Sequence, residues 1–227
     1  MVAKSDTAKV QRNGRGVNTR RYESTLRQAQ AQQTRQAVLD AGRALLIERG
    51  YARTTVRAIA ERAGVAVETV YLHFRSKPRL LQALLDIATG GDEEPIPVYE
   101  REWAQEVLRS PGARAKLATF AEKITVVNAQ LAPLHLATRA AAAADETAAQ
   151  IWAERKATRL RGMGMLTDHL LEVTGLRPGV ETDDARDRLF TLTSPEVYGL
   201  LVLELGWSPA RYASWLADVL IQQLLPT

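Results

Sequence analysis

Hydrophobic residues recur at intervals of three and four along nearly the whole chain, which is the spacing of one face of an α-helix. The residues between them are rich in Ala, Arg, Glu and Gln, whose helix propensity ranges from good to high. We therefore expect an all-α protein of about nine helices, over residues 34–49, 56–63, 66–74, 77–88, 111–130, 135–144, 146–173, 182–205 and 209–225. A further short helix is expected over 102–108. Pro133 should separate two helices, and Pro195 should bend one.

Two short helices joined at Gly64 are the most informative part of this pattern. Glycine reaches positive φ without a Cβ clash, so it permits a tight turn between them. The second helix buries Val70 and Phe74 and exposes a polar and aromatic face, which is the helix-turn-helix pattern. An ordinary helical hairpin is the alternative. The short second helix, its exposed face and the helix start at Lys77, where free N–H groups suit a phosphate, favour DNA binding.

The same stretch resembles the N-terminal signature of TetR-type transcriptional regulators. The resemblance rests on Gly50-Tyr51, Thr54-Thr55-Val56, Ile59-Ala60, Ala63-Gly64-Val65, Thr69-Val70-Tyr71, His73-Phe74, Ser76-Lys77 and Leu80-Leu81. A weaker resemblance, over residues 192–220, is to the last two helices of one branch of that family. The resemblance to this family implies a helix-turn-helix head on a helical body that encloses a small-molecule pocket.

The motif and the resemblance together indicate the residues that contact DNA: Thr55, Arg57, Val67, Glu68, Thr69, Tyr71, Leu72, His73 and Lys77. Side chains near the start of the second helix reach base edges in a helix-turn-helix, and Val67 and Glu68 lie there. Glu68 has two interpretations, an acceptor for cytosine N4 or a solvent-exposed residue at a helix start. Tyr71 likewise either reads DNA or packs its ring on the helices with only its hydroxyl on DNA.

The resemblance adds roles for the remaining candidates. Arg57 matches a position that often reads a base, and an arginine can bond guanine through two atoms. Thr69, His73 and Lys77 match phosphate-contacting positions. Val67 and Leu72 are apolar, which leaves contacts to thymine methyl groups open.

Basic residues concentrate in the N-terminal part of the chain. The first ninety residues contain sixteen Lys and Arg against seven Asp and Glu, a balance of +9. The whole chain carries +4, so the remaining 137 residues carry −5. This asymmetry suits a nucleic-acid-facing head on a mildly acidic body, although basic tails are common on other proteins too. We expect a basic, partly disordered arm over 1–33, a DNA-binding domain over 34–88, and a ligand-binding and dimerisation domain over 89–227.

The composition and motifs argue against several other classes. The chain has no cysteine, which excludes disulfides, thiolate metal sites and cysteine nucleophiles and suits a reducing cytoplasm. No signal peptide is visible, and no apolar run approaches the ~20 residues of a membrane span, so we expect a soluble cytoplasmic protein. His73, His135 and His169 lie in no catalytic or metal-binding motif, so we expect no enzyme activity, metal or cofactor. Close helix packing explains Gly162 and Gly164 better than a nucleotide site does.

The body should hold the ligand pocket that the resemblance implies. The candidates are aromatic, Met and polar residues expected to face its interior: Trp103, Phe120, Asn128, Arg139, Trp152, Met165 and His169. Aromatic and Met residues at helical spacing are also typical of an ordinary core. The polar members would fix the orientation of a ligand.

The last two helices carry a wide apolar stripe that includes Val197, Leu201, Trp215 and Val219. A helix pair of this kind near the chain end can meet its copy as a four-helix dimer interface. Burial within the same subunit is the alternative.

These observations lead to one expected function and two alternatives. We expect a homodimeric transcriptional repressor that a small-molecule ligand releases from a palindromic operator in double-stranded DNA. The first alternative is a dimeric DNA-binding regulator without a ligand. The second is a helical enzyme with a DNA-binding head, which turnover of a bound metabolite would reveal.

Overall fold

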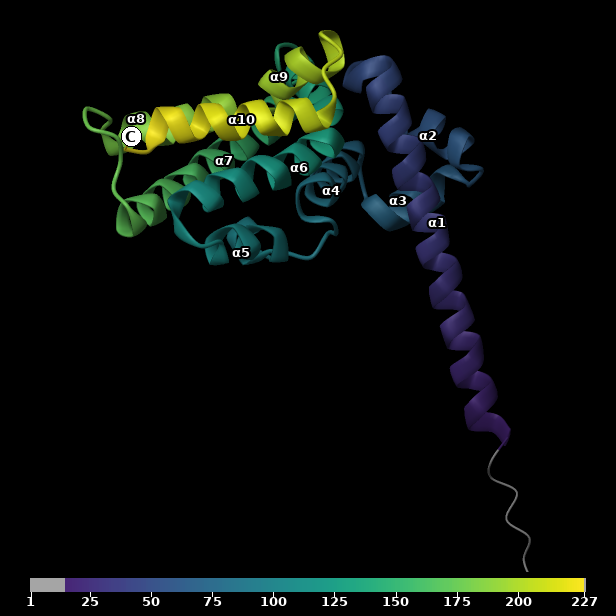
Figure 1. Cartoon of the computed structure of the whole chain (residues 1–227). Coiled ribbons are helices and arrows are strands. Elements are labelled where there is room, and N and C mark those ends of the chain that lie inside the picture. Colours follow the sequence, from purple (N-terminus) through teal and green to yellow (C-terminus); the bar gives the residue numbers. More distant parts are fainter. Residues whose placement is uncertain (1–14, 227) are drawn as a thin grey trace, which may run out of the picture.

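The computed structural model describes residues 15–226, with side chains from residue 26 onward, and every regular element in that part is helical (Figure 1). The head contains α1 (Arg15–Arg53), α2 (Val56–Ala63), α3 (Val67–Phe74) and α4 (Lys77–Gly90). The body contains η1 (Val98–Glu100), α5 (Glu102–Arg109), α6 (Gly112–Ala142), α7 (Glu146–Val173), α8 (Thr182–Leu192), α9 (Pro195–Tyr198), η2 (Gly199–Glu204) and α10 (Pro209–Leu224). The expected all-α class is confirmed.

Polar side chains and a glycine set the limits of the short head helices. Thr55 caps α2 by accepting a hydrogen bond from the N–H of Ala58 at 3.1 Å, and Ser76 caps α4 in the same way. Each cap satisfies an N–H group that has no partner within its helix. Gly64 ends α2 with φ of 69°, a left-handed conformation that suits a residue without a Cβ. The helix-turn-helix therefore has the expected boundaries to within one residue.

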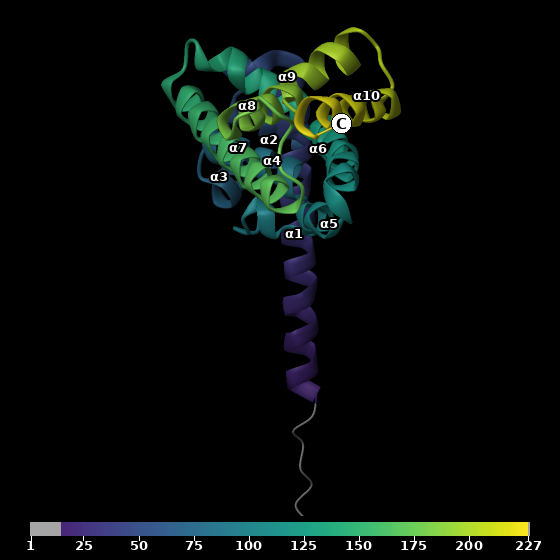
Figure 2. The same cartoon turned by 60° about the vertical axis from the view of Figure 1, so that its left-hand side comes forward.

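The first helix is much longer than expected. It starts at Arg15, whereas the helix was expected from about Thr34, or from Glu23 at the earliest, and residues 1–14 of the expected arm lie outside the described part. The segment over 15–33 projects away from the other helices in both views (Figures 1 and 2), and nearly all the described side chains from 26 to 33 are exposed. The arm was expected because the segment has no apolar periodicity. Its Arg-, Gln- and Ala-rich composition nevertheless has high helix propensity. At the other end the helix was expected to stop at residue 49; instead the chain kinks at Gly50, with φ of 74° and ψ of 168°, and helical structure continues to Arg53.

The central body helix, α6, passes through Pro133 without a break, which corrects the expectation of two separate helices. A proline inside a helix leaves one carbonyl without its usual N–H donor, and tertiary contacts must compensate. The carbonyl without its donor is that of Ala129, and Arg43 of α1 donates from Nη2 to the neighbouring carbonyl of Gln130 at 3.0 Å, which holds α1 against this turn. Ala132 and Leu134 on either side are fully buried. Packing against α1, α4, α7 and α10 therefore outweighs the local cost of the proline.

Pro195 ends one helix and begins another, whereas a single bent helix over 182–205 was expected. The α8 helix stops at Leu192, and Pro195 occupies the first turn of α9, where its missing N–H costs little. Ser194 caps the new helix by accepting from the N–H of Val197. A π-helical stretch, η2, follows directly and shifts which side chains face outward.

Two buried clusters hold the molecule together, and the first joins the head to the body. The head cluster includes Leu134 of α6 and both Ala148 and Ile151 of α7, so body helices complete the core beneath the helix-turn-helix. The second cluster fills the body between α5, α6, α7, α8 and α10. None of the described helices has the length and hydropathy to cross a membrane.

Candidate nucleic-acid interface and body cavity

The turn before α2 is fixed by a buried threonine. Thr54 is fully buried, and its hydroxyl lies 3.1 Å from the carbonyl of Leu45 and 2.8 Å from that of Gly50. After α2, the N–H of Val65 donates to the carbonyl of Ala60 at 3.0 Å and tightens the second turn. These bonds set the angle at which α3 leaves α2, so the sequence around the turns positions the exposed face of α3.

The outer face of α3 is exposed as expected. Val70 and Phe74 are buried on one side. Tyr71 is 50% exposed and Leu72 is 80% exposed on the other, and Glu68 is exposed at the start. An exposed apolar side chain such as Leu72 gains free energy when a base covers it and removes it from water. The geometry therefore suits insertion of α3 into a groove.

Arg57, a predicted base reader, is exposed, with 82% of its side chain accessible. Its Nε lies 2.9 Å from Oε1 of Glu61, one turn along α2. Exposed pairs with this spacing contribute only about 0.3–0.5 kcal/mol, so exchange of Glu61 for a base costs little.

Three other candidates are half-buried. Val67 packs against the head core, which leaves only part of its side chain for a thymine methyl group. Thr69 and His73 are intermediate in exposure. All three lie on α3, and the exposed Thr55, whose hydroxyl already caps α2, directly precedes that helix.

Lys77 is already engaged within the head. Its Nζ donates to the carbonyl of Tyr51 at 3.0 Å and lies 3.8 Å from the centre of the Tyr51 ring. Burial lowers the pKa of Lys77, and the charge of Asp145 at the start of α7 opposes that shift. The ammonium group thus ties α4 to the end of α1, and a phosphate would have to compete with Tyr51 for it.

Arg75 follows α3 directly and was not among the expected contacts. Within the described residues it is the one non-glycine residue with positive φ, at 60°. Its N–H donates to the carbonyl of Tyr71 at 2.8 Å and closes the helix, while its side chain is exposed. Backbone strain of this kind often occurs at functional sites. The residue that ends a helix with positive φ is usually glycine. An arginine directly after the second motif helix was the signal in the sequence that could have indicated this site.

Arg35 connects the end of α3 to the loop after α4. Its Nη1 donates to the carbonyl of His73 at 3.2 Å, its guanidinium lies 4.0 Å from the centre of the Phe74 ring, and Nη2 pairs with Glu93. It was not predicted, because Arg35 lies on α1, far from these partners in the sequence.

Arg101 holds the other side of the same loop. It is 8% exposed, and its guanidinium bonds Oδ1 of Asp92 and the carbonyl of Glu94, both at 2.7 Å. This contact lowers the pKa of Asp92. A Cβ on Gly90 would lie 2.9 Å from the guanidinium carbon, so the backbone approaches Arg101 closely. The loop between head and body is therefore clamped by two arginines.

A cavity of about 820 Å³ lies in the body between η1, α5, α6 and α7. Four of the seven predicted ligand residues line it: Trp103, Phe120, Met165 and His169. Gly162 also lines it, and a Cβ there would meet no atom within 4 Å, so close helix packing was the wrong explanation for this glycine.

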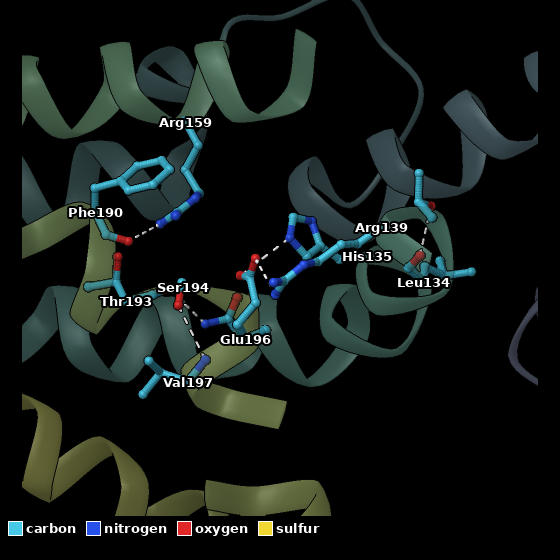
Figure 3. A network of polar contacts seen from close by, with 11 residues as sticks. Leu134, His135, Arg139, Arg159, Phe190, Thr193, Ser194, Glu196 and Val197 are labelled. Carbon is cyan, nitrogen blue, oxygen red and sulfur yellow. Dashed lines mark hydrogen bonds and ion pairs between the residues drawn. The ribbon is translucent and has the colours of Figure 1, made fainter. Parts of the chain in front are cut away.

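The other three predicted ligand residues lie elsewhere. Asn128 is 1% exposed, and its Nδ2 donates to the carbonyl of Thr193 at 3.1 Å. The ring of Trp152 packs on His135 with centroids 4.4 Å apart. Arg139 belongs to the same region (Figure 3), where its Nη1 lies 3.5 Å from Glu196. None of the three is among the residues that line the cavity.

This polar network ties α6, α7 and α9 together (Figure 3). His135 lies with its Nε2 3.4 Å from Oε2 of Glu196 and lowers the pKa of Glu196 to about 2, against the effect of burial. Arg159 donates to the carbonyl of Phe190 at 2.6 Å and stacks on that ring at 3.6 Å. Burial lowers the pKa of Arg159 to about 10. Both of these contacts join α7 to α8, so Arg159 has a structural role.

The predicted dimer residues are half-buried within one subunit. Val197, Leu201 and Trp215 pack against the body cluster, and Val219 is intermediate in exposure. Three leucines of and after η2 are more exposed, namely Leu200, Leu203 and Leu205, at 49%, 50% and 63%. Leu200 and Leu203 lie in the π-helical stretch η2, whose register departs from the regular 3.6-residue period of the prediction, and Leu205 directly follows it.

The sequence of the head matches that of known proteins. The model of "Bacterial regulatory proteins, tetR family" matches residues 38–84. The HTH-type transcriptional regulator TtgR of Pseudomonas putida is 47% identical over 57 residues, which are 25% of this chain and 27% of that protein. The HTH-type transcriptional repressor KstR of Mycolicibacterium smegmatis is 43% identical over 63 residues, 28% of this chain and 31% of KstR. The chain thus matches about a quarter to a third of the length of these relatives.

Solved structures match over most of the chain. A SmeT–triclosan complex covers 85% of this chain and 91% of its own, with TM-score 0.65 and 20% identity. FadR from Bacillus subtilis in complex with stearoyl-CoA covers 82% and 97%, with TM-score 0.65 and 20% identity. At this identity the likeness shows the fold. Within residues 15–226 no group of three His, Asp or Glu side chains is placed to hold a metal ion.

Proposed function

This chain belongs to the TetR family of bacterial regulatory proteins, and we propose that it is a homodimeric repressor that a small molecule releases from a palindromic operator. The observation that carries the proposal is the exposed outer face of α3, with Tyr71 and Leu72 open to solvent beside the exposed Arg57 of α2. These side chains suit base edges in a major groove, the position of the second helix in a helix-turn-helix. We assign this activity to the cytoplasm, where a regulator of bacterial genes meets its DNA.

A dimer supplies the symmetry that a palindrome requires. Two copies of α3 would occupy successive major grooves about 34–36 Å apart. The exposed leucines Leu200, Leu203 and Leu205 supply apolar surface at one end of the body, beside the half-buried Trp215 of α10. An isologous contact pairs such a patch with its own copy.

The place of the cavity supports release by a ligand. Val98, Tyr99 and Trp103 line it, and Arg101 in the same short segment clamps the loop that joins α4 to the body. Arg35 holds the other side of that loop and the end of α3. A ligand that binds better when this segment has moved would shift the population toward a dimer with altered α3 spacing. Two solved proteins with this fold are complexes, one with triclosan and one with stearoyl-CoA.

The test is selection of bound DNA from a random pool by the full chain. We expect one enriched sequence with two inverted half-sites about one helical turn apart. Selection without enrichment, or of a single unrepeated half-site, would contradict the proposal. Addition of small molecules to the selected complex then identifies releasing ligands.

A further inference from the structure

The body core and the head core meet within α6 at Pro133. Ala132, the residue before it, is in the body cluster, and Leu134, the residue after it, is in the head cluster. A proline inside a helix removes one of the backbone hydrogen bonds that stiffen the helix. The backbone of α6 is therefore less restrained by its own hydrogen bonds at the boundary between body and head.

One carboxylate bridges this boundary from outside α6. Glu196 belongs to α9, and Tyr198 of the same helix is in the body cluster. The carboxylate oxygens of Glu196 lie 3.4 Å from Nε2 of His135 and 3.5 Å from Nη1 of Arg139 (Figure 3). Both partners follow Pro133 along α6. Glu196 therefore fastens α9, on the body side, to the part of α6 beyond the proline.

The contact with His135 is the more restrictive of the two. Oε2 of Glu196 and Nε2 of His135 are both shielded from solvent, so each atom has the other in place of water. The ring can donate from Nε2 both as the neutral tautomer that has its proton there and as the charged form. Arg139, in contrast, has 57% of its side chain exposed, and exposed ion pairs contribute little.

His135 lies at the point where two body helices enter the head core. Its ring packs on Trp152 of α7, with centroids 4.4 Å apart. The sequence neighbours of this ring pair, Leu134 on α6 and Ile151 on α7, are both in the head cluster. A restraint on His135 therefore acts directly beside the core of the head.

The other end of the connection leads to the proposed dimer contact. The α9 helix continues directly into η2, which carries the exposed Leu200 and Leu203. Glu196 thus lies at the start of the segment that would meet the second copy. Movement of the head relative to this segment changes the distance between the two α3 helices of a dimer.

We propose that Glu196 is a positioning residue for operator spacing, because its contact with His135 braces α6 across Pro133 and holds the two heads at one separation. The inference rests on the proposed function, since it requires a dimer on a palindrome. Two rigidly held heads gain from the second half-site only when its position matches their separation. Loosely held heads accept several separations, at a lower gain for each.

The test uses the selected operator and a second operator whose spacer is two base pairs longer. The insertion turns one half-site by about 70° relative to the other. Fluorescence anisotropy with the full chain gives the ratio of the two affinities. We expect the wild type to prefer the selected spacer by about tenfold or more, and Glu196→Met to reduce this preference to less than about threefold. Affinity for an operator with one half-site scrambled should stay unchanged.

Two features keep this comparison interpretable. The backbone of α9 and η2 stays packed on α6 in the variant, because Gly199 approaches Leu136 so closely that a Cβ would lie 2.9 Å from it. Glu122→Met is the matched control, since it removes an exposed carboxylate from α6 and should keep the wild-type preference. A Glu196→Met protein that keeps the wild-type preference, or that is monomeric by light scattering, would overturn the proposal.

Two further variants test the brace without Glu196→Met alone. His135→Phe keeps a ring against Trp152, removes the contact from the other side and should give the same loss of preference. Pro133→Ala restores the missing helix hydrogen bond, so in the Glu196→Met background it should recover most of the lost preference. Wild-type preference in His135→Phe, or no recovery with Pro133→Ala, would contradict the assignment.

Failure of the proposed function has a different signature. If the wild type binds both spacers equally, or binds one half-site as tightly as two, the dimer on a palindrome fails and this inference fails with it. If the wild type discriminates and Glu196→Met discriminates equally, only the role of Glu196 fails.

Discussion

Arg35 pairs with Glu93 across the gap between α1 and the loop that leads to the body, and the same guanidinium donates to the carbonyl of His73 at 3.2 Å. One side chain therefore joins the end of α3 to the segment that connects head and body. Its position over the Phe74 ring, at 4.0 Å, holds the guanidinium in this geometry.

We expect Arg35→Met to lower the free energy of unfolding by about 1–2 kcal/mol, because it removes the bond to His73 and the stacking on Phe74. Urea denaturation measures this change. Glu93→Gln is the control, since it removes only a partly exposed ion pair and should cost less than about 1 kcal/mol. Equal effects of the two substitutions would show that the ion pair alone matters.

Arg57→Ala should weaken operator binding by about 1–3 kcal/mol and relax the preference at one position in each half-site. The physical reason is the loss of two bonds to one guanine. Fluorescence anisotropy across a panel of single-base operator variants measures both quantities. Arg62→Ala on the same helix serves as the control, because Arg62 is paired with Glu48 through both terminal nitrogens. Uniform loss from Arg57→Ala would mean that Arg57 contacts phosphate.

Lys77→Met separates a phosphate contact from the internal bond to Tyr51. Methionine keeps the apolar stem over the ring and removes the charge. If Lys77 also binds phosphate, affinity should fall equally for all operator variants, and the logarithmic salt slope should decrease by about 0.9 for each lysine lost. A changed melting temperature with an unchanged slope would make Lys77 a purely structural residue.

Arg75→Gly should stabilise the free protein by about 1 kcal/mol, because glycine adopts a φ of 60° without strain. The same change removes a cation next to α3, so DNA binding should weaken. Thermal unfolding and anisotropy give the two readouts. Arg75→Lys keeps both the strain and the charge and should match the wild type in each. A substitution to glycine that leaves DNA affinity intact would exclude Arg75 from the interface.

Leu203→Glu should give monomers, since it places a charge in the exposed apolar patch of η2. Light scattering at micromolar concentration measures the mass. Val126→Glu is the control, because Val126 is also exposed, at 68%, but lies on α6. A wild type that is itself monomeric would refute the dimer, and a Leu203→Glu variant that stays dimeric would place the interface elsewhere.

The head was predictable because its structure is local. Caps, the glycine turn and a short apolar period fixed α2, and α3 differed by one residue from the expected span. The long N-terminal part of α1 was not predictable, because an exposed helix without an apolar stripe is indicated only by the helix propensity of its residues. The helix break predicted at Pro133 was wrong because the contacts that hold α6 together there are not local: they come from α1 and the body core.

The cavity was predictable only in part. Trp103 and His169 line it, while Asn128 and Trp152 face a different packing environment on the long helices α6 and α7. The residue type does not say which side of α6 or α7 faces the open space. Arg35 and Arg101 were missed because a sequence pattern does not show which loop or helix end a surface arginine reaches in the fold.

The most direct test of the central claim uses the absence of cysteine from the chain. Ala66→Cys places a single thiol at the exposed N-terminal end of α3, where an iron–EDTA reagent can be attached. With the selected operator, we predict two clusters of DNA cleavage about 10 base pairs apart, one for each half-site. Leu171→Cys on α7 carries the same reagent as the control and should give no localised cleavage. A single cluster, or equal cleavage from both labels, would contradict a dimer that places two α3 helices in successive grooves.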